Sequence, residues 1–583
     1  MPFKPDSSYD AQNKIWSGPE TQDYFASDLS IGQIIFHEMR RHPKLIAQVS
    51  PTENTSLTRE ELHLNSMRVA SYFRQLGLAQ TDIVGIIARN TTHMSAVAYG
   101  CFFNGIAFHS LNVTFEQATI ERHFSITKPL LIFCDGDEYE KVKAATSMLN
   151  VKFITMRNHQ SGVMSIEQIL ETPVEPHFEP ARLEQGNKQT LAILCSSGTT
   201  GLPKAVTISN SRKILNCATY LTTADVQFTQ STLDWVTGLL TTVTSGVYST
   251  TRIIVDTPID PAYFLRMVEE YKVTWVLQSS SHMAMITNCS EFETANLQSL
   301  RAYLYGGGKC SVPVQHRMRS HLALDCLHFA YGFTESGTVV SMNWNFDEKP
   351  NSCGRLVEGF KVKILDEQGV PLGPNQVGEI CAYDGEFWAG YYDNPEESCI
   401  MRDSKLWFHT GDLGYMDDDG FLFILDRKKD MLKSCHGVYY PHEIEEVIAR
   451  MPQVAEVCVF GIWNELEADA AAASVVARPG FELQSSQVLE FVREHISIKI
   501  LDEQGVPLGP NQVGEISAYD GEFWAGYYDN SEESSIMRDS KLWFHTGDLG
   551  YMDDDGFLFI LDRKKDMLRF LGIGHWSLIV CRR

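Results

Sequence analysis

The chain has 583 residues, of which 44% are apolar and 21% charged, and its formal net charge is −25. This length exceeds one hydrophobic core, and the composition predicts a folded protein of two or more domains. The negative charge disfavours nucleic acid and anionic membranes as partners, so a phosphate-bearing ligand requires a local basic site. The 13 scattered cysteines form no Cys-x-x-Cys pair. Their pattern argues against a disulfide framework or a structural zinc site and favours a reducing compartment.

Neither end of the chain resembles a targeting signal. The N-terminal MPFKPDSSYD is polar, unlike the apolar segment of a signal peptide, and the last residues are Cys-Arg-Arg, not Ser-Lys-Leu. The longest apolar candidate is AVAYGCFFNGIAF (96–108), which two glycines and an asparagine interrupt. It predicts a buried helix, and no membrane span is expected.

From about residue 30 to 345, short apolar runs alternate with segments of helical spacing. DIVGIIARN (82–90) and PLLIFCDG (129–136) are rich in apolar residues and bounded by turn residues, as buried parallel strands are. SMRVASYFRQLGL (66–78) has helical spacing and a glycine near its end. The alternation predicts an α/β domain in which crossover helices join parallel strands.

The pattern changes near residue 350. GFKVKILDEQGVPLGPNQVGEICAY (359–383) predicts short strands joined by turns, and hence a small β-subdomain. A compact α+β unit is predicted from about Arg427: a helix at 441–453, strands at 454–462 and 471–479, and a helix at 485–496 capped by Ser485 or Ser486.

At Lys499 the chain repeats itself. Residues 363–432 and 499–568 align at a constant offset of 136, and 67 of the 70 positions are identical. Two long copies separated by 66 residues are not a solenoid repeat. They indicate either a tandem duplication of a coding segment or an error of sequence assembly.

The sharpest local motif is LAILCSSGTTGLPKAV (191–206), in which an apolar strand leads into a polar, glycine-containing loop. Its hydroxyls, exposed amides and Lys204 can all donate to phosphate oxygens. A Walker A loop is excluded, because Pro203 precedes the lysine and no Gly-Lys-Ser/Thr follows. The loop residues are therefore candidate phosphate ligands: Ser196, Ser197, Gly198, Thr199, Thr200 and Gly201.

This loop resembles the phosphate-loop signature of the adenylate-forming superfamily, which includes acyl-CoA synthetases, 4-coumarate–CoA ligases and firefly luciferase. The usual Lys-Gly is Lys204-Ala205 here. The resemblance covers about residues 30 to 495. It implies an α/β fold with three parts: a large adenylation domain (1–426) of parallel-sheet subdomains and a β-barrel-like subdomain, a small α+β C-terminal domain (427–497) that is incomplete, and the duplicate with a divergent tail (498–583).

Further family motifs occur in the expected order. YLYGGGKC (303–310) resembles the turn that holds adenine, with Gly306, Gly307 and Gly308 as its flat surface and Tyr305, Lys309 and Cys310 as departures. YGFTE (331–335) matches closely. The resemblance implies that Tyr331, followed by Gly332, stacks on adenine, that Thr334 contacts phosphate, and that Glu335 holds Mg²⁺.

The duplicated segment also carries a family motif. Thr410-Gly411-Asp412 resembles the Thr-Gly-Asp whose carboxylate accepts hydrogen bonds from both ribose hydroxyls, and Arg427 is expected to reach ribose or phosphate. The resemblance implies an interdomain hinge near Lys429 and Asp430. Trp235 lies where some fatty acyl members gate the acyl tunnel, with a core tryptophan as the alternative.

The sequence departs from the family after the helix at 485–496. No segment resembles Pro-x-x-x-x-Gly-Lys-x-x-Arg, whose lysine assists adenylation, and the repeat occupies its place. Lys433 is implied as a contact in the second half-reaction, and His436 stands where glycine is usual. Asp548 and Arg563 of the second copy are not expected to bind nucleotide, because the other motifs occur once.

The leading hypothesis is therefore an ATP-dependent acid–CoA ligase acting on a small carboxylic acid, ATP and coenzyme A with Mg²⁺. A fatty acid is the first expectation for the substrate and an aryl-propenoate the second. The alternatives are a pseudoenzyme that binds nucleotide without turnover and a luciferase-like oxygenase. The family suggests a cytoplasmic or peroxisomal location, and the oligomeric state is left open.

Overall fold

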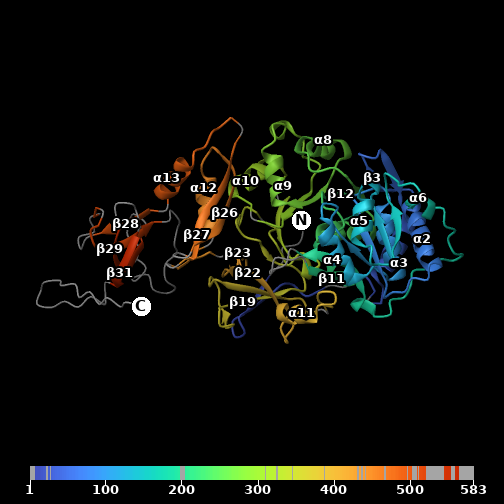
Figure 1. The fold of residues 1–583 in the computed structure, drawn as a ribbon, viewed down its shortest axis with the longest axis horizontal. Coiled ribbons are helices and arrows are strands. Elements are labelled where there is room, and N and C mark those ends of the chain that lie inside the picture. The colour runs from blue at the N-terminus through green and yellow to red at the C-terminus, as the bar shows by residue number, and fades with distance from the viewer. Residues whose placement is uncertain are drawn as a thin grey trace, which may run out of the picture. The chain divides into compact units, whose positions relative to one another are not determined.

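The computed structural model divides the chain into two compact units, residues 1–429 and 430–583 (Figure 1). The residues that the structure describes are 7–21, 24–26, 28–196, 204–308, 310–323, 326–344, 346–385, 388–429, 432–434, 437–439, 441–464, 468–478, 480–495, 497–501, 508–509, 511–519, 544–552 and 558–563. Each unit has its own sheets and its own apolar clusters.

The first sheet of unit 1 is mainly parallel. Its order is β11 (Lys204–Ser209), β10 (Thr190–Ser196), β6 (Ala107–Ser110), β5 (Ile83–Ile87), β7 (Leu131–Cys134), β8 (Lys152–Thr155) and β9 (Met164–Ser165). Only β11 runs antiparallel to its neighbour. Every residue of β5 and β7 is buried, as expected of parallel strands covered on both faces. The associated helices are α2 (Arg59–Gln75), α3 (Met94–Asn104), α4 (Gln117–Thr127), α5 (Tyr139–Ala145) and α6 (Ile166–Ile169).

The second sheet of unit 1 has nine strands. Its order is β18 (Arg355–Leu356), β17 (Ser341–Met342), β16 (Leu327–Tyr331), β15 (Ala302–Gly306), β14 (Trp275–Ser279), β12 (Val226–Phe228), β13 (Thr251–Ile253), β3 (Ile46–Ser50) and β4 (Thr55–Thr58). The strands from β16 to β3 are parallel, and both edges are antiparallel. The helices of this region are α1 (Ile31–Arg41), α7 (Val236–Val247), α8 (Pro261–Tyr271), α9 (Ser280–Thr287) and α10 (Val312–His321).

The third sheet of unit 1 is antiparallel. It runs β1 (Ser8–Asp10), β2 (Ile15–Ser17), β19 (Lys361–Leu365), β21 (Gly378–Tyr383), β22 (Phe408–Met416) and β23 (Leu422–Arg427), with β20 (Pro371–Leu372) paired to β19 and α11 (Pro395–Met401) between β21 and β22. The N-terminal strands therefore complete a subdomain that otherwise comes from residues beyond 350. This is the small β-subdomain that the sequence predicts.

The start of unit 2 is an α+β layer. Its sheet runs β25 (Gly437–Tyr439), β24 (Leu432–Ser434), β27 (Ala468–Ala477) and β26 (Val454–Asn464), and it is accompanied by α12 (Pro441–Ala449) and α13 (Ser485–His495). An apolar cluster around Ile448, Val459 and Val488 joins the two helices to β26. These elements match the predicted order of helix, strand, strand and helix.

The duplicated segment forms a separate four-stranded sheet in unit 2. Its strands are β28 (Ser497–Leu501), β29 (Gly514–Tyr519), β30 (Phe544–Met552) and β31 (Leu558–Arg563). The register repeats that of the first copy, bulges included: Asp548 pairs with Arg563 as Asp412 pairs with Arg427. The identical residues of the two copies therefore form the same strands, although the sheet of the second copy lacks the β1–β2 hairpin that flanks the first copy.

One predicted element is wrong in part. The run AVAYGCFFNGIAF was expected to be a single buried helix, but α3 ends at Asn104 and β6 begins at Ala107. Gly105 caps the helix in the left-handed conformation, with φ 68°, and so turns the chain into the strand. In the described part of the chain, no helix is both long and apolar enough to cross a bilayer.

Candidate nucleotide site

Strands β10 and β11 hold the two ends of the predicted phosphate loop. Ser196 and Lys204 are paired across the antiparallel ladder, where β10 ends and β11 begins. The rest of the loop lies outside the described residues, namely Ser197, Gly198, Thr199, Thr200 and Gly201. The two ends of the loop are thereby fixed side by side on the sheet.

Lys204 is buried between an acidic and an aromatic partner. Its side chain is 8% exposed and forms an ion pair with Glu397 of α11. Its Nζ also lies 4.9 Å from the centre of the Tyr391 ring. An ammonium group over an aromatic face is attracted by the ring, and more strongly when both are shielded from water. A phosphate group that approaches Lys204 therefore competes with the Glu397 carboxylate for the ammonium group of Lys204.

Glu335 belongs to the same polar cluster. It lies in the 3-10 turn η5 (Thr334–Ser336), which contacts β10 and β11. The Tyr391 hydroxyl donates to Glu335 Oε1 at 2.7 Å. Burial raises the pKa of Glu335, and the hydrogen bond from Tyr391 offsets part of this rise. Tyr391 thus links the lysine that follows β10 to the carboxylate that follows β16.

The glycine turn follows β15. A Cβ on Gly306 would lie 2.2 Å from the carbonyl oxygen of Ala330 on β16, and Gly307 has a φ of 75°, while a Cβ on Gly308 would meet open space. Glycine is therefore required at 306 because there is no space for a Cβ, and it is favoured at 307 because of the positive φ. Tyr305, a departure from the family pattern, is fully buried and donates to Gln315 at 2.9 Å. It belongs to the core and leaves the turn itself open.

A second polar cluster joins β16 to the antiparallel sheet. The Tyr331 hydroxyl donates to Asp412 Oδ2 at 2.6 Å, and Arg427 Nε lies 3.3 Å from Asp412 Oδ1. Burial and the neighbouring Asp412 raise the pKa of Tyr331 well above its usual value, so its hydroxyl stays protonated. Thr410 accepts from the Asp412 amide at 3.0 Å and fixes the turn of the chain. Gly332, the exposed residue after Tyr331, leads directly to Thr334 and Glu335.

The sequence profile of the AMP-binding enzyme family matches residues 35–392, more than half of the chain, and that of the AMP-binding enzyme C-terminal domain matches 443–500. The chain belongs to the AMP-binding enzyme family. Both predicted parts of an adenylate-forming enzyme are thereby present. The C-terminal match ends one residue after Lys499, where the duplication begins.

Known members of the AMP-binding family are similar over most of their length. 4-coumarate–CoA ligase 1 from Arabidopsis thaliana is 24% identical over 84% of this chain and 91% of its own. Luciferin 4-monooxygenase from Photuris pensylvanica is 25% identical over 85% and 95%. Among solved structures, ATP-bound MatB from Rhodopseudomonas palustris has a TM-score of 0.72, with 21% identity over 82% of this chain and 94% of that one. The structural likeness shows the shared fold.

Trp235 and Lys433 complete the predicted set. Trp235 is the N-cap of α7 and is 59% exposed, which excludes the alternative of a core tryptophan. Lys433 belongs to β24 of unit 2. His436 lies outside the described residues.

Tyr391 and Glu397 were missed by motif analysis. Neither is part of a short signature, because their contacts to Lys204 and Glu335 arise from chain segments more than 50 residues apart. Both lie in the run GYYDNPEE (390–397), in which Asn394 caps α11 and Glu397 belongs to the first turn of the helix. Glu335 also lines a pocket together with the aromatic residues Phe333, Trp388 and Phe408.

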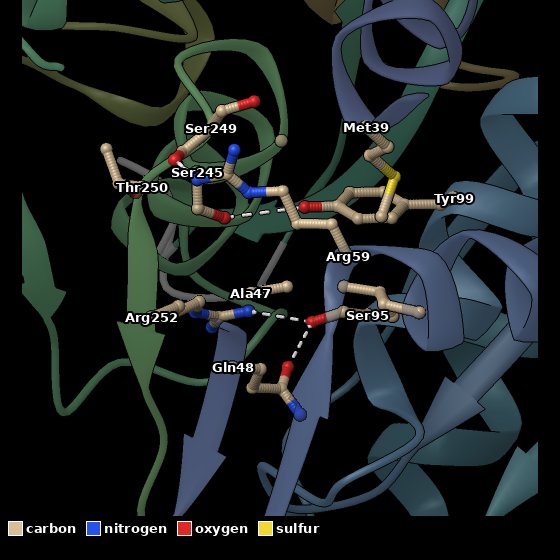
Figure 2. A pocket seen from close by; sticks show the side chains of 12 residues that line it. Met39, Ala47, Gln48, Arg59, Ser95, Tyr99, Ser245, Ser249, Thr250 and Arg252 are labelled. Atoms are coloured by element: carbon tan, nitrogen blue, oxygen red, sulfur yellow. Dashed lines mark hydrogen bonds between the residues drawn. The ribbon is translucent and has the colours of Figure 1, made fainter. Parts of the chain in front are cut away.

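A separate pocket lies between β3, α2, α3 and α7. Figure 2 shows Arg252 directed toward Ser95, whose hydroxyl donates to Gln48 at 2.6 Å. Arg252 Nη1 lies 3.4 Å from Ser95 Oγ, and burial lowers the pKa of Arg252 to about 10. Arg59 from α2 also lines this pocket and donates to the Ser249 carbonyl. None of the predicted nucleotide residues lines it.

Proposed function

We propose that this protein is an ATP-dependent carboxylic acid–CoA ligase. The observation that carries the proposal is the 2.6 Å hydrogen bond between Tyr331 and Asp412. It brings the position expected to stack on adenine next to the position expected to bind ribose, although 81 residues separate them. Family membership and the adjoining cluster of Lys204, Tyr391 and Glu335 support the same site.

The proposed nucleotide lies along these two clusters. Adenine rests on Gly306–Gly308 and Tyr331, the ribose hydroxyls donate to Asp412, and Arg427 contacts ribose or phosphate. A carboxylate suits the ribose because it offers several acceptor positions to paired donors. The phosphates lie toward the loop that includes Ser196, near Lys204 and Thr334.

Glu335 is the proposed ligand of Mg²⁺. Mg²⁺ keeps several waters and is usually bound through one or two carboxylates together with substrate phosphates. Glu335 fits this pattern, because one oxygen of its carboxylate accepts from Tyr391. Its raised pKa reflects the cost of burying a charged carboxylate, which a bound cation would offset. When bound, the ion would neutralise phosphate charge.

The proposed reaction has two steps. A substrate carboxylate attacks the α-phosphate of ATP, giving an acyl-adenylate and pyrophosphate, and the thiol of coenzyme A then displaces AMP to give the thioester. Activation through a bound intermediate divides one difficult step into two easier ones. Lys433 is proposed to contact substrate in the second step.

The acid is proposed to be a fatty acid, with an aryl-propenoate as the second choice. The exposed Trp235 is a candidate contact for an acyl chain, whereas the relatives named 4-coumarate–CoA ligase support the aryl acid. Fatty acids of graded length, 4-coumarate and other small acids should therefore be assayed with ATP and coenzyme A for AMP and thioester. No product from any acid would contradict the ligase proposal.

A nucleotide-binding pseudoenzyme is the second candidate. The observation that favours it is the end of the C-terminal domain match at residue 500, where the duplicate stands in place of the adenylation-lysine segment. Calorimetric ATP binding without pyrophosphate release would support this candidate. Pyrophosphate release at a rate typical of enzymes, about 1 per second or faster, would exclude it.

A further inference from the structure

Three potential metal ligands meet beneath the end of β10. They are His109 from β6, His123 from α4 and Cys195 from β10, and one ligand atom of each lies within 4.8 Å of the others. The Cys195 sulfur is 3.9 Å from His109 Nε2 and nearly equidistant from the two ring nitrogens of His123, at 3.7 Å from Nδ1 and 3.8 Å from Nε2. Both histidines are almost fully buried, and Cys195 is partly exposed. The set therefore has an interior side and one side open to solvent.

Thr127 fixes the tautomer of His109. Its hydroxyl donates to the His123 carbonyl oxygen at 3.3 Å, so its oxygen accepts from His109 Nδ1–H at 2.9 Å. The proton of His109 is thereby placed on Nδ1, and the lone pair of Nε2 faces the Cys195 sulfur. A hydrogen bond to the distal nitrogen is the usual support of a metal-ligating histidine.

We propose that His109, His123 and Cys195 bind a zinc ion, with water as the fourth ligand. In a tetrahedral site with Zn–S of about 2.3 Å and Zn–N of about 2.0 Å, the sulfur and nitrogen ligands are about 3.6 Å apart. The three sulfur–nitrogen distances here, 3.7 to 3.9 Å, are close to this value. Soft thiolate together with imidazole in a tetrahedral set selects zinc over magnesium or calcium.

The charges around the site are compatible with a divalent cation. Burial lowers the pKa of His109 well below its usual value and that of His123 to about 4, so both imidazoles are neutral ligands at neutral pH. Binding replaces the Cys195 thiol proton, which leaves to solvent. The pKa of Cys195 is raised mainly by the burial of its thiol and, to a smaller extent, by the negative charge of Asp234. The Cys195 thiolate would supply one negative charge to the ion.

The site would tie three elements together next to the phosphate loop. Cys195 directly precedes Ser196, while His109 and His123 come from the neighbouring strand and the helix that follows it. Zinc binding is therefore expected to raise the melting temperature of unit 1. The inference is independent of the proposed ligase activity, because it concerns groups outside the nucleotide clusters.

The test uses the full-length chain loaded with Zn²⁺ or with Co²⁺ as a spectroscopic probe. We expect one Zn²⁺ per chain after dialysis, and with Co²⁺ a thiolate charge-transfer band and the intense d–d bands of tetrahedral cobalt. Cys195→Ser should abolish the charge-transfer band and weaken binding by about 100-fold or more, and Thr127→Val by about 10- to 100-fold.

Two matched variants serve as controls. Cys289→Ser removes a partly exposed thiol elsewhere, and Thr146→Val removes a buried helical hydroxyl that bonds a carbonyl of its own helix, as Thr127 does. Both should leave stoichiometry and spectra unchanged. The proposal is overturned if the unaltered chain retains no stoichiometric Zn²⁺, or if the cobalt charge-transfer band persists in Cys195→Ser.

Discussion

Asp412 is the residue on which the proposed nucleotide site depends most. Its carboxylate accepts from Tyr331 and is expected to accept from two ribose hydroxyls. Hydrogen bonds to a charged group contribute about 1.5–3 kcal/mol each, so Asp412→Ala should lower ATP affinity by over about 100-fold. Isothermal titration of the full chain with ATP measures the loss. The Tyr331 hydroxyl also loses its acceptor, so the titration is made well below the melting temperature.

The duplication supplies an internal control for this prediction. Asp548 has the same register partner, Arg563, and its amide donates to Thr546 as that of Asp412 donates to Thr410. The YGFTE motif that provides Tyr331 occurs once in the chain. Asp548→Ala should therefore leave ATP affinity within twofold, and equal losses in the two variants would refute the assignment of the site to the first copy.

Tyr391 is predicted to set the pH dependence of ATP binding through Glu335. Burial raises the pKa of Glu335, and the hydrogen bond from the Tyr391 hydroxyl lowers it. Tyr391→Phe should therefore raise the pKa of Glu335 further. The ionised form of Glu335 is then lost at higher pH on acidification. The acidic limb of Mg·ATP affinity should move to higher pH, with little change at pH 8. Tyr392→Phe, at the adjacent position, is the control, and an unshifted limb in Tyr391→Phe would count against the role of Glu335.

Individual site residues differ in how far the sequence could predict them. Ser196, Tyr331 and Asp412 stand in short motifs whose local chemistry indicates a ligand, and the structure places the last two in contact. Tyr391 and Glu397 could not be found in this way. Their roles come from tertiary contacts with Glu335 and Lys204, and no local pattern encodes such contacts.

At the scale of elements, the packing of β13 and β3 beside α3 encloses a cationic side chain (Figure 2). Within the described residues, no carboxylate lies within ion-pair distance of Arg252. Its pKa falls from 12.5 to about 10, so the folded state disfavours the charged form at every pH below 10, by roughly 3 kcal/mol. Arg252→Met should therefore raise the free energy of unfolding by about 1–3 kcal/mol. Thermal denaturation of unit 1 measures the change.

Arg157 provides the contrasting case for Arg252. It is ion-paired with the fully buried Asp135 at 3.2 Å and also with Asp256. Arg157→Met removes the cation paired with Asp256 and one of the two cations paired with Asp135, the other being Arg89, and should destabilise unit 1 by up to about 3–5 kcal/mol. Loss of stability of similar size in both variants would show that Arg252 is as well compensated as Arg157.

Helices and strands were predicted correctly where the apolar periodicity of a segment agreed with the turn residues at its ends. The buried strands β5 and β7 and the helices α12 and α13 follow apolar patterns bounded by turn residues. The prediction failed at the boundary between α3 and β6, because both are buried on all sides and only Gly105 and Ile106 separate them. Apolar runs of this kind do not distinguish a buried helix from a buried strand.

At the scale of the whole molecule, the α/β class and the antiparallel subdomain follow from the sequence pattern, but strand order does not. The pairing of β3 with β13 and of β2 with β19 joins residues about 200 and 345 positions apart. Such pairings depend on the packing of complete sheets and leave no local trace. The identity of the two copies implies the same strands twice, and the second copy forms a four-stranded sheet of its own.

The division into two units leads to a calorimetric prediction for the full chain. Unfolding enthalpy scales with size, at about 0.7 kcal/mol per residue, so unit 1 (1–429) should give the larger of two transitions. All described residues of the two nucleotide clusters lie in unit 1. Saturating Mg·ATP, at about 100 times Kd, should stabilise the larger transition by about 2.7 kcal/mol and leave the smaller one unmoved. Asp412→Ala should abolish the shift, whereas an equal shift of both transitions would mean that unit 2 also binds the nucleotide.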